Sequence, residues 1–347
     1  MVLVKRRMLF LVIIVILLLI IIANWITPHY YEYNGIPALA NCDKDFAQSQ
    51  KYILFPMVTI TWNLGLGNQI FEVSSLLGLA HTLNRTAIFN ADDWVLHSNL
   101  DVLQKNVPRI VERVISIPIV PSEATRFSYS VACCHYQFAS ILSCEQSKFL
   151  VIQGRYFQSF KYFSSIESSI RKWLKPPSSE EVALKNSVKK KDELRFKTCV
   201  HVRRKDFVND GVHAGTNQAF TIRAIDYLYT INPGLIFIFS DDPEWVRVNI
   251  FGNLDYQYDV KIMQTPNNEA IKDLYFSQIY CDSVLITAPS SSFAWWLGYL
   301  SKNQSNVFYR DIRETEDNVK RQMVEEDFFP SSWKKLGMTR NGLIVPK

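Results

Sequence analysis

The chain contains little glycine and proline, with 12 glycines and 14 prolines among 347 residues. Hydrophobic residues make up 48% of it. This composition excludes collagen-like and disordered proteins and is typical of a folded chain with a sizeable core. The length exceeds that of most single domains, so we expect two domains that share one globular body.

Sequence signatures of metal and nucleotide sites are missing as well. No two cysteines have the C-x-x-C spacing of a zinc site. The glycine turn at 63–68 matches neither G-x-G-x-x-G nor a Walker motif. The only D-x-D, Asp43-Lys44-Asp45, precedes the first core segment. We therefore expect no structural metal site.

A large excess of charge of one sign is also lacking, since 38 basic residues face 33 acidic ones. Three of the basic residues, Lys5, Arg6 and Arg7, lie together near the N-terminus. The remaining chain has a net charge of only +2, from 35 basic and 33 acidic residues. Nucleic acid is therefore not an expected partner.

The long hydrophobic run at 8–26 predicts a membrane anchor. It carries no charge and follows a basic cytosolic tail at 1–7. Its 19 residues approach the roughly 20 that span a bilayer as a helix. A cleaved signal peptide is the alternative, but no A-x-A-like site follows the run. The basic flank should stay cytosolic, which places the rest of the chain in the lumen.

Two sequons agree with a lumenal location and predict N-glycosylation at Asn84 and Asn303. Six cysteines would meet an oxidising environment there, although their pairing cannot be deduced from the sequence. Cys199 and Cys281 lie in apolar runs, where buried free thiols are an alternative to a disulfide.

The pattern beyond the anchor predicts a stem at 27–55 and two α/β domains at 56–180 and 181–347. In the first domain we expect a strand at 57–62, the glycine turn, a helix, and further strands at 87–89 and 149–152. A break at 175–181 and a charged helix that carries Lys189, Lys190 and Lys191 should mark the junction.

The second domain reads as a parallel, doubly wound sheet. Buried strands are predicted at 197–202, 235–239 and 283–287, with helices between them. Asp242 and Pro243 predict a helix start, with Asp242 as the N-cap. A further helix is expected at 293–300.

Polar residues follow the first of these strands, at the edge where open α/β sheets bind ligands. This cluster contains His201, Arg203, Arg204, Lys205 and Asp206. Arginine offers a rigid fork that matches phosphate oxygens, so one or both arginines could hold a diphosphate. A solvated surface pair salt-bridged to Asp206 is the alternative.

Two other strand ends point to the same edge. Ser240 and Asp241 follow one strand, and the turn Ser290-Ser291-Ser292-Phe293 follows another and opens a helix. Hydroxyls and helix N-terminal amides suit a phosphate or a ribose, although ordinary helix capping would also explain the turn. Asp241 could bind a ribose or base, and we do not expect it to bind metal.

The helix after the glycine turn supplies two more candidates. Asn68 and Glu72 lie one helical turn apart and hence on one face. Glu72 could act as a general base, although a lone helical glutamate is more often merely solvated.

These motifs together resemble the alpha-1,2-fucosyltransferase family, glycosyltransferase family 11. The resemblance rests on five motif segments that follow one another in the same order as in that family, at 65–71, 154–163, 201–207, 237–245 and 273–300. It implies a GT-B-like fold with two Rossmann-like domains, GDP-fucose as donor, and inverting transfer to a terminal galactose hydroxyl without an obligatory metal. It also implies a single-pass type II protein of the Golgi membrane.

The resemblance assigns roles to individual residues. Arg203 and Arg204 match the paired arginines that grip the diphosphate, and His201 and Asp206 support them. Ser290 to Phe293 match the donor-side serine turn, and Asn68 matches an asparagine near the reacting centre. The resemblance names no base; from their proximity to these motifs, Glu72 is the first choice and Asp210 the second, and an acceptor activated without a protein base is the third possibility.

Three residues depart from the family pattern. Lys205 stands where glycine is usual, Phe207 where tyrosine is common, and Arg155 interrupts the usual Gly-Tyr-Phe-Gln. A lysine beside the diphosphate could strengthen binding or obstruct it. Lys205 therefore leaves a catalytically silent glycan-binding homologue as one alternative function. A protein O-fucosyltransferase, which would share the arginines, the fold and the donor, is the other.

Overall fold

The computed structural model describes residues 50–129, 132–263 and 269–347. The predicted tail, the predicted anchor at 8–26 and most of the predicted stem lie outside the described residues. Within the described part, no helix is both long and apolar enough to cross a membrane.

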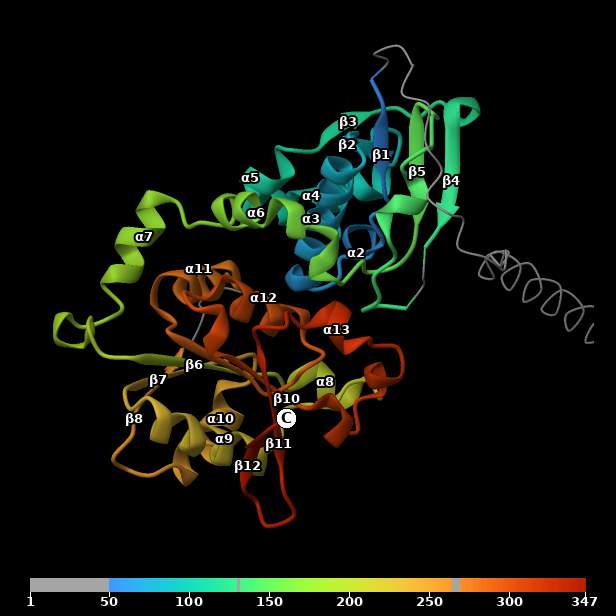
Figure 1. Ribbon diagram of the computed structural model, residues 1–347. Coiled ribbons are helices and arrows are strands. Elements are labelled where there is room, and N and C mark those ends of the chain that lie inside the picture. Colours follow the sequence, from blue (N-terminus) through green and yellow to red (C-terminus); the bar gives the residue numbers. More distant parts are fainter. Residues whose placement is uncertain (1–49, 130–131, 264–268) are drawn as a thin grey trace, which may run out of the picture. The chain divides into compact units, whose positions relative to one another are not determined.

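The first lobe, residues 50–163, is built on a five-stranded sheet whose strands are all parallel, in the order β3-β2-β1-β5-β4 (Figure 1). Its elements are β1 (Tyr52–Leu54), α2 (Val58–Thr61), α3 (Leu66–Thr82), β2 (Thr86–Asn90), α4 (Trp94–Asn106), α5 (Pro108–Val111), β3 (Ile115–Ile117), β4 (Ala124–Ser128) and β5 (Phe149–Gln153). Helix α3 is buried along most of its length because it contacts both this sheet and α12 of the second lobe.

The second lobe, residues 197–347, contains a seven-stranded sheet in the order β12-β11-β10-β9-β6-β7-β8, parallel except for β12. Its elements are β6 (Lys197–Val202), α8 (Lys205–Asn209), α9 (Gln218–Ile231), β7 (Leu235–Ser240), α10 (Pro243–Asn249), β8 (Asp259–Met263), α11 (Ile271–Tyr280), β9 (Ser283–Ile286), α12 (Ser292–Leu300), β10 (Val307–Arg310), α13 (Glu325–Phe328), β11 (Lys334–Met338) and β12 (Ile344–Pro346). The predicted strands and the predicted helix at 293–300 are confirmed in this lobe.

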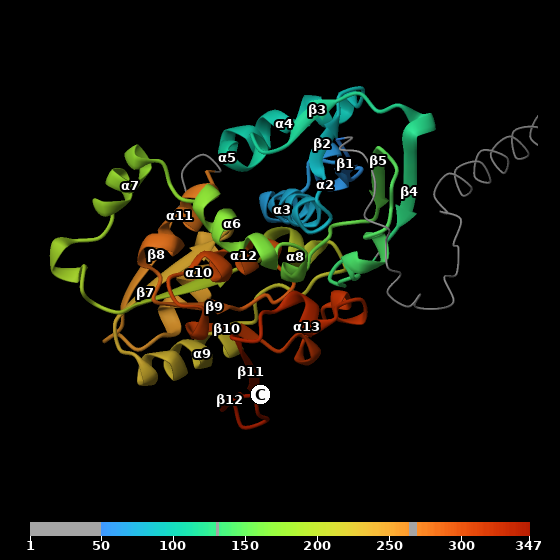
Figure 2. The same ribbon diagram turned by 45° about the horizontal axis from the view of Figure 1, so that its top comes forward.

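Successive side chains of a strand point to opposite faces of its sheet. The buried strands of the second sheet therefore present apolar side chains on both faces, and helices cover both (Figure 2). Cys199 and Phe237 point into a core shared with the first lobe and with α11 and α12. Their neighbours Val200 and Ile236 point into a second core, which α9 and α10 close. The chain is therefore mixed α/β with two parallel sheets, as predicted.

The predicted strand at 57–62 is wrong, because the strand lies earlier, at Tyr52–Leu54, within the predicted stem. Met57 has a φ of 51° and is the N-cap residue of helix α2. The amides of Val58 and Thr59 both donate to the carboxylate of Glu72, at 2.9 Å each. These amides are satisfied by a side chain and are not available to a strand ladder.

The prediction of a helix that carries Lys189, Lys190 and Lys191 is also wrong. Helix α6 (Glu167–Trp173) is followed by α7 (Ser178–Lys185), which falls on the segment expected to break the pattern. Pro177 immediately precedes α7, and Glu180 and Glu181 lie in its first turn, where acidic side chains are favoured. Lys190 and Lys191 lie instead on a short 3-10 turn, Lys190–Asp192.

The cysteines of the described residues are disulfide-bonded, so the alternative of free thiols at Cys199 and Cys281 is wrong. These two buried residues form a bond that links β6 to the end of α11. Cys133 and Cys134 form a second bond between sequence neighbours, and Cys144 is disulfide-bonded as well. Cross-links of this kind persist in an oxidising compartment.

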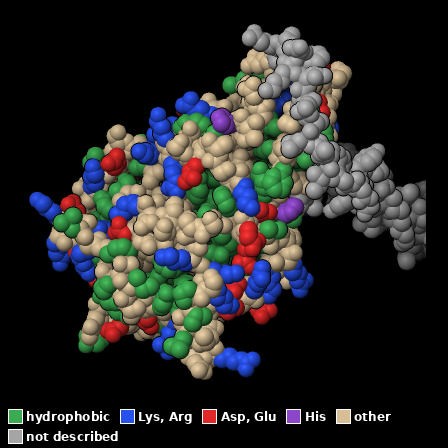
Figure 3. Space-filling view, viewed as in Figure 1, with side chains coloured by type: hydrophobic (Ala, Val, Ile, Leu, Met, Phe, Trp, Pro, Cys, Tyr) green, Lys and Arg blue, Asp and Glu red, His purple; other side chains and the backbone are tan. Residues whose placement is uncertain are grey.

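Charged side chains of both signs are interspersed over the face seen in Figure 3. This mixture agrees with the small net charge of the sequence. Both predicted glycosylation sites, Asn84 and Asn303, are exposed. Asn84 follows the C-cap of α3 with a φ of 51°, and Asn303 caps a short 3-10 turn.

Glu72 has a structural role that can be tested by unfolding. Its carboxylate is fully buried and also accepts from the hydroxyl of Thr59. We expect Glu72→Ala to lower the free energy of unfolding by at least about 2 kcal/mol, because it leaves buried amides unpaired. Urea titration checks this, and a variant as stable as the wild type would contradict it.

The same carboxyl should make stability depend on pH. Burial raises the pKa of Glu72 from 4.5 to about 7, against the lowering effect of its bonds from Thr59 and Val58. The folded state then keeps a proton that the unfolded state loses, so this contribution is full below pH 4.5 and disappears as pH rises through 7. The stability advantage of the wild type over Glu72→Gln should decline between pH 5 and pH 8.

Candidate functional site

A pocket of about 980 Å³ lies between the two lobes. The first lobe contributes residues 64–68 and the region of the predicted Tyr-Phe-Gln motif, and the second lobe contributes the carboxyl ends of β6, β7 and β9. The lining residues singled out below are Asn68, Tyr156, Gln158, His201, Arg203, Lys205, Asp206, Phe207, His213, Ser240, Asp241, Asp273, Ser290, Ser291, Ser292 and Phe293. The sequence-predicted strand ends therefore meet at one site.

Hydrogen bonds between strand ends fix the floor of this pocket. Thr287, just after β9, donates to the carbonyl of His201 at 2.6 Å. Its hydroxyl also lies 2.7 Å from that of Thr216, which accepts from the amide of Arg203 at 2.9 Å. The chain after β6 is thus held to the end of β9, and Arg203 leaves the sheet from a fixed position.

Arg203 presents its guanidinium to the pocket. Its Nη2 lies 2.7 Å from Asp206 Oδ2, and its Nε lies 3.5 Å from Asp241 Oδ2. The guanidinium carbon is also 5.5 Å from the centre of the Phe207 ring. Two carboxylates orient the group while its side chain keeps 30% of its surface exposed. A rigid guanidinium held in this way matches the oxygens of a diphosphate.

Arg204, which was predicted to share this role, does not line the pocket. Its guanidinium carbon lies 4.3 Å from the centre of the Trp245 ring, and its Nη1 donates to the carbonyl of Thr216 at 3.0 Å. Its amide donates to Asp241. The two arginines therefore diverge, and Arg204 holds the loop rather than facing the pocket.

His201 lines the pocket with an uncharged imidazole. It is 4% exposed, and its ring centre lies 5.7 Å from that of Phe293. Burial, and then the charge of Arg203, lower the pKa of His201 to about 3. Within the described ranges its Nδ1 has no hydrogen-bond partner. Because the imidazole is uncharged, the positive charge in this part of the pocket comes from Arg203 and not from His201.

The serine turn, residues 290–293, both caps helix α12 and lines the pocket. Ser290 donates to Asp317 at 2.5 Å, and Ser291 caps α12 by accepting from the amide of Ala294. At the end of β7, Ser240 accepts from the amide of Asp242. Capping is therefore confirmed for Ser291, and the turn also lines the pocket. Binding of a phosphate or ribose by these serines stays a prediction.

Asn68 lines the pocket from the first lobe, but Glu72 does not. Asn68 Oδ1 accepts a 2.6 Å hydrogen bond from Gln158 Nε2. Glu72 points away, toward the start of α2, where its two oxygens are occupied. Its prediction as the base is therefore not supported, since a general base must reach the proton that it removes.

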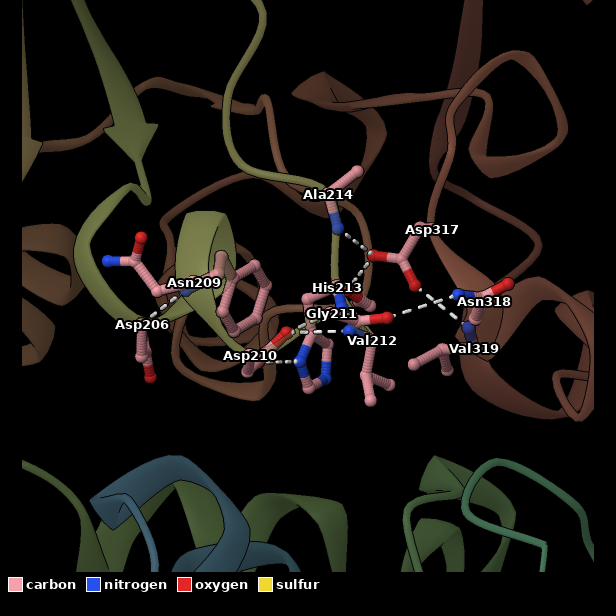
Figure 4. A network of polar contacts seen from close by, with 12 residues as sticks. Asp206, Asn209, Asp210, Gly211, Val212, His213, Ala214, Asp317, Asn318 and Val319 are labelled. Carbon is pink, nitrogen blue, oxygen red and sulfur yellow. Dashed lines mark hydrogen bonds and ion pairs between the residues drawn. The ribbon is translucent and has the colours of Figure 1, made fainter.

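Sequence reasoning named no site role for several of the lining residues. Gln158 lies in the Tyr-Phe-Gln-Ser run that carried the resemblance, so the motif could have identified it. His213 carried only a weak signal, an Asp-x-x-His spacing with Asp210. The structure pairs these two at 2.6 Å (Figure 4).

Metal ligands are not gathered in the described part of the chain. No group of three or more His, Cys, Asp or Glu side chains is placed there to hold a metal ion. Asp242, adjacent to Asp241, serves as the N-cap of α10, as predicted.

Known proteins resemble this chain over most of its length. The model of Glycosyl transferase family 11 matches residues 26–336. A Caenorhabditis elegans protein named galactoside 2-alpha-L-fucosyltransferase is 64% identical over 326 residues, which cover 94% of this chain and 92% of that protein. A second C. elegans protein of that name is 34% identical over 319 residues, which cover 81% of this chain and 76% of that protein.

Among solved structures, the fucosyltransferase NodZ from Bradyrhizobium is similar with a TM-score of 0.46 and 13% identity. That similarity covers 77% of this chain and 97% of that one. The match to the family model over most of the chain, together with the 64% identical relative, shows that the chain belongs to glycosyl transferase family 11.

Proposed function

We propose that this protein is a galactoside 2-alpha-L-fucosyltransferase, which transfers L-fucose from GDP-fucose to the 2-hydroxyl of a terminal galactose with inversion. Family membership and the 64% identical relative support this activity. The observation that carries it is the guanidinium of Arg203, held by two carboxylates at the carboxyl end of β6 and exposed to the pocket.

In this reaction the acceptor oxygen attacks the anomeric carbon from the face opposite GDP. The bond between that carbon and the β-phosphate oxygen breaks, and its electron pair leaves with GDP. Negative charge therefore grows on the diphosphate, where a preoriented guanidinium stabilises it more in the transition state than in the bound donor. The two parallel-sheet lobes fit a GT-B-like arrangement, with the donor on the second lobe and the acceptor on the first.

Lys205 adds a second cation at the same place. It is the first residue of α8 and lines the pocket, and its ammonium forms no ion pair within the described residues. We propose that it strengthens donor binding, in contrast to the glycine that is usual at this position.

The proposal includes location in the Golgi membrane, as a single-pass type II protein with its catalytic region in the lumen. The uncharged run at 8–26 behind three basic residues supports this topology. Disulfides and two exposed sequons are also compatible with a lumenal chain.

Replacement of Arg203 tests the donor site. We expect Arg203→Ala to lower kcat/KM for transfer at least about 100-fold, because removing one such fixed donor raises the barrier by about 3 kcal/mol. GDP release with a galactose-terminated acceptor measures this. Arg247→Ala is the matched control, since Arg247 is exposed on α10 and, among the residues that the structure describes, forms an ion pair with Glu244 alone. Transfer by Arg203→Ala at the control's rate would refute the assignment.

Metal dependence provides a separate test. Because side-chain cations are placed at the departing diphosphate, we expect transfer to continue in excess EDTA at a rate within about twofold of the untreated enzyme. Rates are compared after chelation and after addition of Mg²⁺ or Mn²⁺. Loss of transfer on chelation and recovery with either metal would show that the donor site needs an ion.

A further inference from the structure

The proposed reaction leaves one proton to be removed, that of the acceptor hydroxyl. A base must lie in the pocket and offer a free lone pair. Asp206 and Asp241 both line the pocket, but each is paired with Arg203. His201 is buried as the neutral imidazole and lies at the floor of the pocket. Two other groups line the pocket, Asp273 in the first turn of α11 and His213 on the loop after α8. Of these, His213 has a ring nitrogen bonded to a carboxylate, that of Asp210.

His213 is oriented by Asp210. Its Nδ1 lies 2.6 Å from Asp210 Oδ2, and the other carboxylate oxygen accepts from the amides of Val212 and His213 at 2.8 and 2.9 Å. Partial burial alone would raise the pKa of Asp210, but these hydrogen bonds lower it to about 2. An ionised carboxylate can only accept, so the ring proton lies on Nδ1 and the lone pair on Nε2.

The ring and its loop are fixed on both sides. The imidazole stacks on Phe207, with ring centres 4.2 Å apart and planes inclined by 13°. Figure 4 shows the loop held from the C-terminal segment. Asn318 donates its amide to the carbonyl of Val212, and Asp317 accepts from the amide of Ala214. Asp317 also accepts from Ser290, so the loop is connected to the serine turn.

The position of His213 suits contact with an acceptor. The side chain is 29% exposed, and it lines the same pocket as Asn68 and Gln158 of the first lobe. The charged groups nearby are Asp210 on its own loop, Arg203 and Asp206 around Phe207, and buried Asp317 behind the loop. The ring nitrogen bonded to Asp210 is Nδ1, so Nε2 is the nitrogen on the other side of the ring.

We propose that His213 is the catalytic base of this enzyme, with Asp210 as its positioning residue, an inference that rests on the proposed fucose transfer. The hydroxyl O–H bond breaks and its proton moves to His213 Nε2. The oxygen's electron pair forms the bond to the anomeric carbon as GDP leaves. The resulting imidazolium is stabilised by Asp210 and releases its proton to solvent.

The test compares His213→Gln with the wild type. Glutamine keeps a polar side chain but cannot take up the proton, so kcat should fall by about 100-fold or more. The dissociation constant for GDP, measured by calorimetry, should stay within about twofold. Unchanged GDP binding shows that the variant is folded, and His81→Gln, an exposed histidine at the end of α3, serves as the control.

The pH profile separates a base from a structural role. The acidic limb of the kcat/KM profile should be present in the wild type and absent in His213→Gln. In Asp210→Asn, kcat should fall at least about tenfold and the limb should move to lower pH, since the imidazolium loses its anionic partner.

Other outcomes are equally decisive. If His213→Gln transfers fucose at the wild-type rate, or loses rate with its acidic limb intact, the inference is wrong. If Asp273→Asn loses transfer while His213→Gln keeps full activity, the base is Asp273 of α11 and the inference is wrong. If the wild type itself releases no GDP from GDP-fucose with any galactose-terminated acceptor, the proposed function fails, independently of His213.

Discussion

The contact between helices α3 and α12 is the constraint on which the site depends. Gly67 lies so close to α12 that a Cβ atom there would come within 2.6 Å of the Phe293 amide nitrogen. Its carbonyl accepts a 3.0 Å hydrogen bond from the indole of Trp296. The Phe71 ring packs against Trp295 and Trp296, with centres 4.5 and 5.0 Å apart. This shared core brings Asn68 of the first lobe to the serine turn of the second.

The side chains of the two neighbouring arginines, Arg203 and Arg204, point in different directions. Arg203 extends into the open space, whereas Arg204 is covered by Trp245 and bonded to Thr216. Stacking on an aromatic face and bonding to a carbonyl both use the planar geometry of arginine, so a lysine could not replace Arg204 there. One arginine of the pair thus builds the loop that orients the other.

The sequence was sufficient for the family, the two parallel sheets and the strand ends that meet at the pocket, because buried parallel strands are continuous apolar runs. It was insufficient where a distant side chain decides the outcome. Glu72 turns the apolar segment after β1 into a helix and is itself removed from the site. Likewise, the divergence of Arg203 and Arg204 depends on Trp245, 41 residues away, and the Cys199–Cys281 bond depends on β6 lying beside β9.

A crystal structure of the protein with GDP and a galactose-terminated acceptor tests the central claim most directly. The account predicts the diphosphate within hydrogen-bond distance of the Arg203 guanidinium and of the serine turn, with Arg204 still stacked on Trp245. It also predicts the acceptor hydroxyl within reach of His213 Nε2. A diphosphate bound by Arg204, released from Trp245, with Arg203 still occupied by its two carboxylates would contradict the account.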